Sequence, residues 1–146
     1  MKLLSRSPDD TEEIGFRLGK ILRAGDVVGL YGDIGTGKTT MVKGIAKAFG
    51  INRRDVTSAS FTIIAEYPGE PPFYHIDLYR IGAGNDLEST GIWDCIGRDS
   101  VSVIEWAEKL GGVAIQDFIK VIIDDAGNDC REITIEGTDE QDWNNL

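Results

Sequence analysis

The sequence predicts an α/β fold, built on a mixed and mostly parallel sheet that is flanked by helices and extended by antiparallel hairpins. Short apolar runs alternate with helical periods over the first two-thirds of the chain, which is typical of a parallel sheet. One apolar run leads into a glycine-rich loop that a helical period follows. The chain has 146 residues, 41% of them apolar, so it is long enough for one domain with one sizeable core.

The first predicted element is a helix that starts at Ser7 and ends before Gly25. Ser7 can cap this helix, Pro8 suits its first turn, and acidic residues follow near its positive end. Apolar residues recur there at helical spacing, at Ile14, Leu18, Ile21 and Leu22. Residues 27–31 are then predicted to form a buried strand, and residues 38–49 a second amphipathic helix.

The rest of the chain is predicted to consist of strands around one helical segment. The predicted strands are 61–67, 73–79, 101–105, 118–123 and 132–136, and the predicted helix is 86–96. The first two strands form a hairpin, because Pro and Gly crowd the turn between them, and the last two form a closing hairpin. We expect residues 1–137 to form the domain and residues 138–146 a polar, frayed tail.

The net charge of −10 is distributed unevenly along the chain. Residues 1–54 hold ten Lys or Arg and six Asp or Glu, whereas residues 55–146 hold five and nineteen. An acidic chain is a poor independent binder of nucleic acid, because it lacks the cations that displace counterions from phosphates. We expect the acidic half to keep the chain soluble, and docking on a basic protein surface is the alternative.

The apolar runs are too short for a membrane span, and the first residues turn acidic too early for a signal peptide. Cys95 and Cys130 are too few for a disulfide framework or a zinc site. They are expected to be small buried hydrophobic residues in a reducing compartment. We therefore expect a cytoplasmic protein that does not contact a membrane.

Residues 32–39 match the phosphate-binding pattern G-x-x-x-x-G-K-[ST] in full. Glycines let the backbone curl so that its N–H groups point at phosphate oxygens, and the following helix presents its positive end to the same anion. In this pattern Lys38 reaches the β- and γ-phosphates, and the Thr39 hydroxyl ligates Mg²⁺. An apolar strand precedes the loop and an amphipathic helix follows it, so the sequence predicts a single P-loop NTPase-like domain.

A P-loop enzyme also needs an acid at the end of a neighbouring strand, close to the metal or its waters. The chain offers two such acids. Glu105 ends the apolar run 101–104, which is the usual form of this element, and Asp77 ends the run 73–76. The residues alone leave open which of the two acids holds the metal.

Three further features carry weaker predictions. Residues 94–97 have the D-x-x-G spacing of GTPases, but they follow a helical stretch and no N-K-x-D motif is present. His75 is the single histidine and is expected to be an ordinary strand side chain. A basic stretch surrounds the second helix, at Lys43, Lys47, Arg53 and Arg54. This stretch is expected to be a solvated face, and a contact with RNA or an acidic partner is the alternative.

Four motifs in order resemble those of the TsaE (YjeE) family, which are small bacterial ATPases required for making threonylcarbamoyladenosine in tRNA. The motifs are the phosphate loop 32–40, the run His75-Ile76-Asp77-Leu78-Tyr79-Arg80, the run Ile104-Glu105-Trp106, and the segment Ser7-Pro8-Asp9-Asp10-Thr11. The resemblance covers nearly the whole chain, from about residue 5 to residue 136. Its motifs are short one by one, but their order and spacing make the set specific.

The resemblance implies a role for each matched position. The residues that would contact ATP or ADP are Thr11, Asp33, Ile34, Gly35, Thr36, Gly37, Lys38, Thr39, Thr40 and Arg131. Thr39 and Glu105 would ligate Mg²⁺. Asp77 and Lys38 would be catalytic, Asp77 by positioning water or a metal-bound water.

The resemblance further implies that the protein hydrolyses ATP weakly on its own. It would act with the threonylcarbamoyl-transferase subunit TsaD and its paralogue TsaB, so that tRNA is contacted only indirectly or through the complex. Two alternatives stay open. A small-molecule kinase would need a second-substrate pocket and an arginine-rich lid. A nucleotide-sensing module would bind nucleotide and a partner without useful turnover.

One motif departs from the family pattern. The family has Ser-Pro-Thr-Phe or Ser-Pro-Thr-Tyr in a switch-like loop, where this chain has Ser58-Ala59-Ser60-Phe61. Serine can still supply a hydroxyl. Without the proline, we expect the loop to have more backbone freedom to lose when it becomes ordered.

Overall fold

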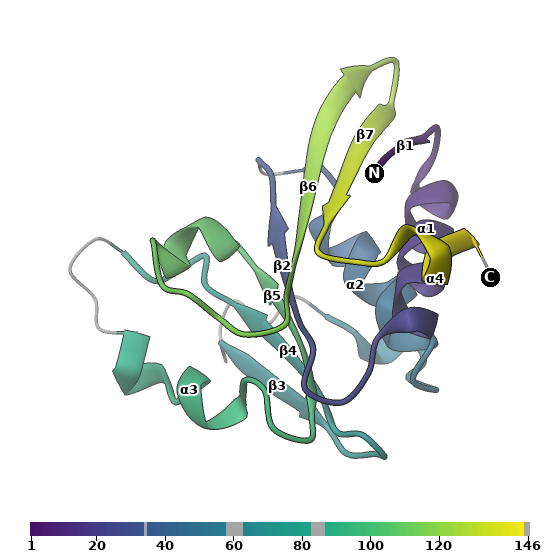
Figure 1. The fold of residues 1–146 in the computed structure, drawn as a ribbon. Coiled ribbons are helices and arrows are strands. Elements are labelled where there is room, and N and C mark those ends of the chain that lie inside the picture. Colours follow the sequence, from purple (N-terminus) through teal and green to yellow (C-terminus); the bar gives the residue numbers. More distant parts are fainter. Residues whose placement is uncertain (34, 58–62, 83–86, 145–146) are drawn as a thin grey trace.

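The computed structural model describes residues 1–33, 35–57, 63–82 and 87–144. One sheet of seven strands forms its centre, in the order β1-β7-β6-β2-β5-β4-β3 (Figure 1). The strands are β1 Lys2–Ser5, β2 Val27–Tyr31, β3 Ile64–Tyr67, β4 Phe73–Asp77, β5 Val101–Glu105, β6 Phe118–Gly127 and β7 Cys130–Glu136. The helices are α1 Pro8–Ile21, α2 Lys38–Lys47, α3 Ile92–Cys95 and α4 Glu140–Asn144, with 3₁₀ turns η1 Arg53–Asp55, η2 Leu87–Thr90 and η3 Ala107–Leu110. The predicted α/β class with a mixed sheet is confirmed.

Parallel pairing is confined to the centre of the sheet. Strands β6, β2, β5 and β4 run parallel to one another, whereas β3 pairs antiparallel with β4 at one edge. At the other edge β7 pairs antiparallel with both β6 and β1. Both predicted hairpins are therefore confirmed. Strand β1 was not predicted, because four residues carry little periodicity and their partner strand lies at the far end of the chain.

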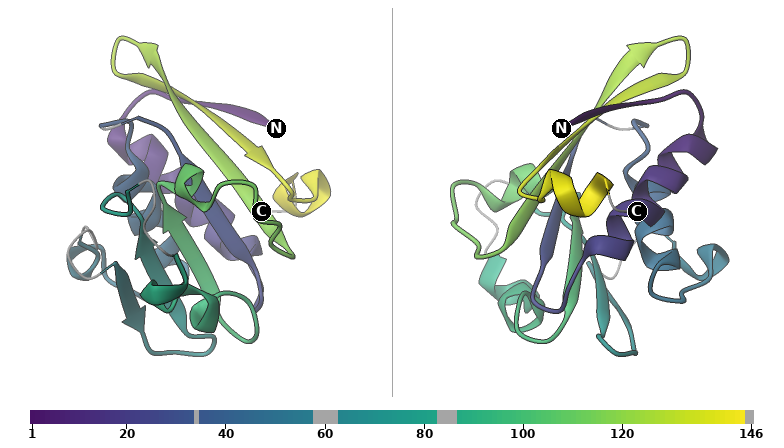
Figure 2. Two further views of the ribbon diagram at one scale, coloured as in Figure 1. Left: turned by 90° about the vertical axis from the view of Figure 1, so that its left-hand side faces the viewer. Right: turned by 45° about the vertical axis from the view of Figure 1, so that its right-hand side comes forward.

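Helices cover both faces of the sheet. Helices α1 and α2 pack on one face, and α3 with η2 and η3 lies on the other (Figure 2). The central strands are buried on both faces, so neighbouring side chains enter different cores. In β2, Val28 packs in the core beneath α1 and α2, and Val27 packs in the opposite core.

The two helices α1 and α2 approach each other closely through glycines. A Cβ atom on Gly44 of α2 would lie 2.0 Å from the carbonyl oxygen of Glu12 in α1. From the other side, a Cβ on Gly15 would lie 2.6 Å from the Met41 carbonyl oxygen. Because α2 begins at the predicted phosphate loop, this close contact fixes the position of that loop on the sheet.

The predicted helices are shorter in the structure, and the one predicted over 38–49 ends at Lys47. Helix α1 is capped by the Ser7 side chain as expected, but it ends at Ile21, before the turn at Gly25. The segment predicted as one helix over 86–96 contains η2 and the short α3, separated by Gly91. Gly91 has a φ of 81°, a left-handed conformation that interrupts a right-handed helix.

The C-terminal tail is not frayed over its described residues. Residues 140–144 form α4, and Trp143 is only 3% exposed. The guanidinium of Arg17 lies 4.8 Å from the centre of the Trp143 ring, which ties α4 to α1. A buried tryptophan offsets the polar composition of the tail, so the expectation of fraying is wrong for residues 140–144.

The two cysteines are free thiols, as expected, but both are half-buried rather than fully buried. Among the described residues, no helix combines the length and the apolar character that crossing a membrane requires.

We predict that Gly44→Ala destabilises the fold by about 1–3 kcal/mol or more, because the added methyl group overpacks the α1–α2 contact. Alanine favours helices over glycine by about 1 kcal/mol, so destabilisation here would show that packing dominates. The measurement is the free energy of unfolding in urea.

Gly112→Ala is the matched control, because a Cβ there meets nothing within 4 Å. It should leave the free energy of unfolding nearly unchanged. Equal stability of the two variants would contradict the packing argument.

Candidate functional site

The phosphate-loop motif connects the end of β2 to the start of α2. Gly35 and Gly37 have φ values of 79° and 106°, which side chains other than glycine rarely adopt. Gly37 is the N-cap residue of α2, so the helix begins immediately after the loop. The start of this ten-residue helix faces the loop, which is the arrangement that binds anions at P-loops.

The Lys38 side chain is folded back into the loop and is only 5% exposed. Its Nζ atom donates to the carbonyl oxygens of Gly32 and Asp33, at 2.5 and 2.9 Å, and lies 4.0 Å from the centre of the Trp106 ring. Burial lowers the pKa of the Lys38 ammonium. Four carboxylates counteract this by raising that pKa: Glu108, Glu105, Asp33 and Asp77. The lysine is thus surrounded by neutral and negative groups at the place where the motif expects phosphate.

The two strand-end acids lie next to each other. Strands β4 and β5 are parallel neighbours, and their register places Asp77 beside Glu105. Both carboxylates are only 3% exposed. Parallel strands bring their carboxyl ends to one edge of the sheet, so two acids that are 28 positions apart in sequence reach the same site.

Glu105 is held from two sides. The Thr39 hydroxyl donates to Glu105 Oε1 at 2.9 Å, and His75 Nε2 lies 2.5 Å from Glu105 Oε2. Asp77 has a different setting, since its Oδ1 accepts the backbone N–H of Tyr79 at 2.9 Å. Glu105 thus contacts the first turn of α2 through Thr39.

The Thr39 and Glu105 oxygens suit Mg²⁺. Mg²⁺ prefers oxygen ligands, and proteins commonly hold it with one or two carboxylates together with nucleotide phosphates and water. A hydroxyl that donates to a carboxylate keeps lone pairs for a metal. The described residues contain no group of three or more His, Cys, Asp or Glu side chains that could hold a metal by themselves. A Mg²⁺ ion whose remaining ligands are phosphate oxygens and water does not need three such side chains.

Thr11 and Arg131 both lie at the loop. The Thr11 methyl carbon is 3.8 Å from the place that a Cβ on Gly37 would occupy, and its hydroxyl is 2.7 Å from the Ser5 hydroxyl. Arg131 donates to the carbonyl oxygens of Thr36 and Gly35, at 3.1 and 3.3 Å. In this structure the arginine supports the loop itself.

The remaining predicted nucleotide contacts follow the loop. Asp33, Gly35 and Thr36 belong to the curl before α2, and Thr40 lies in the first turn of α2. Ile34 lies outside the described residues, and so does the switch-like run 58–61.

Sequence reasoning missed the contact of His75 with Glu105. His75 was expected to be an ordinary strand side chain, yet it is fully buried against a carboxylate of the site. Its position was a usable signal. Side chains two positions apart on a strand point to the same face, so a histidine two residues before Asp77 shares the face of that acid.

The basic stretch is largely a solvated surface, as expected. Lys47 is exposed with its ammonium 5.1 Å from the centre of the Phe16 ring. The Arg53 side chain is 61% exposed and lies 3.2 Å from Glu12. Both cations thus interact with α1.

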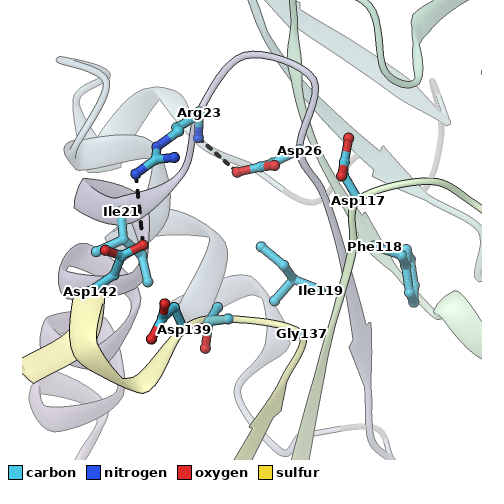
Figure 3. Close-up of a pocket in the computed structure, with 10 residues that line it drawn as sticks. Ile21, Arg23, Asp26, Asp117, Phe118, Ile119, Gly137, Asp139 and Asp142 are labelled. Carbon is cyan, nitrogen blue, oxygen red and sulfur yellow. Dashed lines mark hydrogen bonds and ion pairs between the residues drawn. The ribbon is translucent and has the colours of Figure 1, made fainter.

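Two cavities lie at opposite ends of the sheet. A cavity of about 450 Å³ adjoins the phosphate loop and is lined by Asp33, Glu108, Asp125 and Arg131 among others. A cavity of about 210 Å³ lies where β2 and β6 begin, and Asp26, Asp117 and Asp142 line it (Figure 3). Ligands of open α/β sheets bind at the carboxyl ends of the parallel strands, which favours the loop end as the functional site.

The chain is similar to known proteins over most of its length. The model of the family described as threonylcarbamoyl adenosine biosynthesis protein TsaE matches residues 5–133. The tRNA threonylcarbamoyladenosine biosynthesis protein TsaE of Treponema pallidum is 36% identical over 135 residues, which are 92% of this chain and 99% of that protein. The corresponding Bacillus subtilis protein is 38% identical over 135 residues, 92% of this chain and 84% of that protein.

The fold is shared with a solved relative as well. The crystal structure of Bacillus subtilis YdiB superimposes with a TM-score of 0.72 and 35% sequence identity, covering 92% of this chain and 83% of that one. The family model and the relatives span the phosphate loop, both strand-end acids and the histidine. This chain therefore belongs to the TsaE family of threonylcarbamoyl adenosine biosynthesis proteins.

Proposed function

We propose that the protein binds ATP with Mg²⁺ at the phosphate loop and hydrolyses it to ADP and phosphate, in support of tRNA N6-threonylcarbamoyladenosine biosynthesis. The hydrogen bond between Thr39 and Glu105, beside the buried Lys38, is the observation that carries the proposal. It joins the start of α2 to the end of β5, the two elements that would hold the metal in a P-loop site. Such a role belongs in the cytoplasm, where tRNA is modified.

Phosphate binding would replace the present hydrogen bonds of the Lys38 ammonium with bonds to phosphate oxygens. The ammonium now donates to two neutral carbonyl oxygens, and phosphate oxygens are stronger acceptors because they are charged. The backbone N–H groups of the loop and of the first turn of α2 would bind the same phosphates. Phosphate charge would also raise the pKa of Lys38, which burial lowers, and so keep the ammonium protonated.

Thr39 and Glu105 would hold Mg²⁺, which supplies neutralisation of charge on the phosphates when it is bound. Asp77 is then the candidate for positioning the attacking water. Its carboxylate lies beside Glu105, and the Tyr79 N–H fixes its Oδ1 atom. A fixed carboxylate can orient a water and accept its proton.

Partners are expected to complete the site. Arg131 already donates to the carbonyl oxygens of Thr36 and Gly35, and Nη1 contacts Asp125 at 3.3 Å. Because its guanidinium is hydrogen-bonded to the loop backbone, Arg131 is poorly placed to stabilise the negative charge of the phosphoryl group during transfer. We propose that TsaD and TsaB assemble with this chain and raise its turnover, and that tRNA meets the complex rather than the isolated protein.

A nucleotide-sensing module without useful turnover is the second candidate. The contact of Lys38 with the Trp106 ring favours it. A change at the phosphates would alter the surroundings of Trp106, whose ring packs on that of Tyr79, an exposed residue. Phosphate release separates the two functions.

We predict slow ATP hydrolysis by the isolated chain and faster hydrolysis when TsaB and TsaD are added. An arginine that a partner inserts into a P-loop site can raise the rate of hydrolysis by about 10³–10⁵, which sets the scale of the possible stimulation. The measurement is phosphate release under multiple turnover. Lys38→Ala should abolish it in both conditions, and release that persists in this variant would place the activity elsewhere.

We predict different losses from the two strand-end acids. Glu105→Gln should weaken Mg²⁺-dependent ATP binding, because an amide replaces a charged ligand of a hard cation. Asp77→Asn should leave ATP affinity within a few-fold and reduce hydrolysis by about 10²-fold or more. Calorimetry at several Mg²⁺ concentrations and single-turnover phosphate release measure the two effects. The reverse pattern would exchange the assigned roles.

We predict that ADP with Mg²⁺ changes the tryptophan fluorescence, since the Trp106 ring contacts the lysine that meets the phosphates. Trp106→Phe should remove most of the change, while Trp93→Phe, at a tryptophan on α3, should retain it. A change that survives Trp106→Phe would show that this ring does not sense the site.

A further inference from the structure

His75 has a buried imidazole ring that lies against the candidate site. The side chain is fully buried on β4, and its Nε2 atom lies 2.5 Å from Oε2 of Glu105. Glu105 is itself only 3% exposed, so the contact is shielded from bulk solvent. The role proposed above for Glu105 in holding Mg²⁺ makes no use of the histidine.

In the metal-binding role proposed for Glu105, the histidine supplies the hydrogen of this contact. An ionised carboxylate only accepts hydrogen bonds, so Nε2 carries the hydrogen whether the ring is neutral or charged. The other ring nitrogen, Nδ1, is buried and has no hydrogen-bond partner among the described residues. Leaving a buried polar atom without a partner costs free energy, which an apolar side chain of similar size would avoid.

Packing alone therefore does not account for a histidine here. Residues 73, 75 and 77 of β4 point to the same face of the sheet, and Phe73 fills its position with an apolar ring that is 1% exposed. What His75 adds over such a ring is one donor aimed at Glu105. A hydrogen bond from this donor restricts the orientation of the Glu105 carboxylate.

We propose that His75 is a positioning residue that fixes the Glu105 carboxylate for Mg²⁺. With Oε2 held by His75, the Oε1 atom is directed at Thr39 and the start of α2. Rotation about the last bond of a glutamate side chain is otherwise soft, and a second orientation would turn the bound oxygen away. The inference rests on the proposed function, in which Thr39 and Glu105 hold the metal.

The test compares three substitutions at the same position. His75→Leu fills a similar volume without a donor. His75→Gln places an amide N–H near the location of Nε2, whereas the shorter His75→Asn places it near Nδ1, out of reach of Glu105. Ser102→Ala is the matched control. Ser102 is also fully buried, and its hydroxyl has no hydrogen-bond partner among the residues that the structure describes, but it shares the opposite face of β5 with Ile104.

The readout is ADP binding by calorimetry across a Mg²⁺ titration and in EDTA, with the midpoint of urea unfolding for each variant. His75→Leu and His75→Asn should raise the Mg²⁺ concentration that gives half of the maximal enhancement of ADP binding. We expect a rise of about 10–100-fold, as for other groups that orient metal ligands. ADP affinity in EDTA should stay within a few-fold. His75→Gln should recover most of the loss, and Ser102→Ala should resemble the unmodified protein.

Two results would overturn the proposal. One is an unchanged Mg²⁺ requirement in both His75→Leu and His75→Asn, and the other is an equal loss in all three variants that follows their unfolding midpoints. If His75→Leu does not fold, His75→Gln and His75→Asn decide the question between them, because both carry the same amide. The proposed function fails separately, when the unmodified chain itself shows no effect of Mg²⁺ on ADP binding.

Discussion

The hydrogen bond from Thr39 to Glu105 joins the first turn of α2 to the end of β5, and the geometry of the site depends on it. One partner belongs to the phosphate loop and the other to the centre of the sheet. The glycine contact between α1 and α2 sets the position of the helix, and parallel pairing sets the position of the strand end. A displacement of either element by one ångström would break the bond, because hydrogen bonds weaken steeply beyond normal length.

The site concentrates charge where solvent is scarce. The side chains of Lys38, Asp77 and Glu105 are each at most 5% exposed, and each has polar partners in the protein. Burying charges is costly unless they are paired and hydrogen-bonded, so this arrangement uses folding energy to keep the groups fixed. Fixed groups need little reorganisation when a charged ligand arrives, which is the property that catalysis by positioning requires.

Much of this arrangement could be predicted from local patterns in the sequence. The phosphate loop and the strand 101–105 were placed correctly because glycine spacing and apolar runs are local signals. Strand β1 and helix α4 were missed because their stability comes from partners far along the chain, β7 and the Arg17 side chain. The spacing places His75 on the face of Asp77, but for the same reason its contact with Glu105 could not be predicted. Thirty positions separate these residues, and only the pairing of β4 with β5 brings them together.

The pairing of β1 with β7 gives the order of synthesis a consequence for the assembly of the candidate site. Ser5 lies opposite Arg131 in this pairing, and these two residues hold Thr11 and the phosphate loop respectively. A chain leaving the ribosome exposes the loop motif, residues 32–40, long before it exposes Arg131. It acquires the strand that flanks the loop only when residue 136 has emerged. A nascent chain therefore carries the loop motif before the strand that supports it has been made, and the proposed site is complete only when β1 has paired with β7.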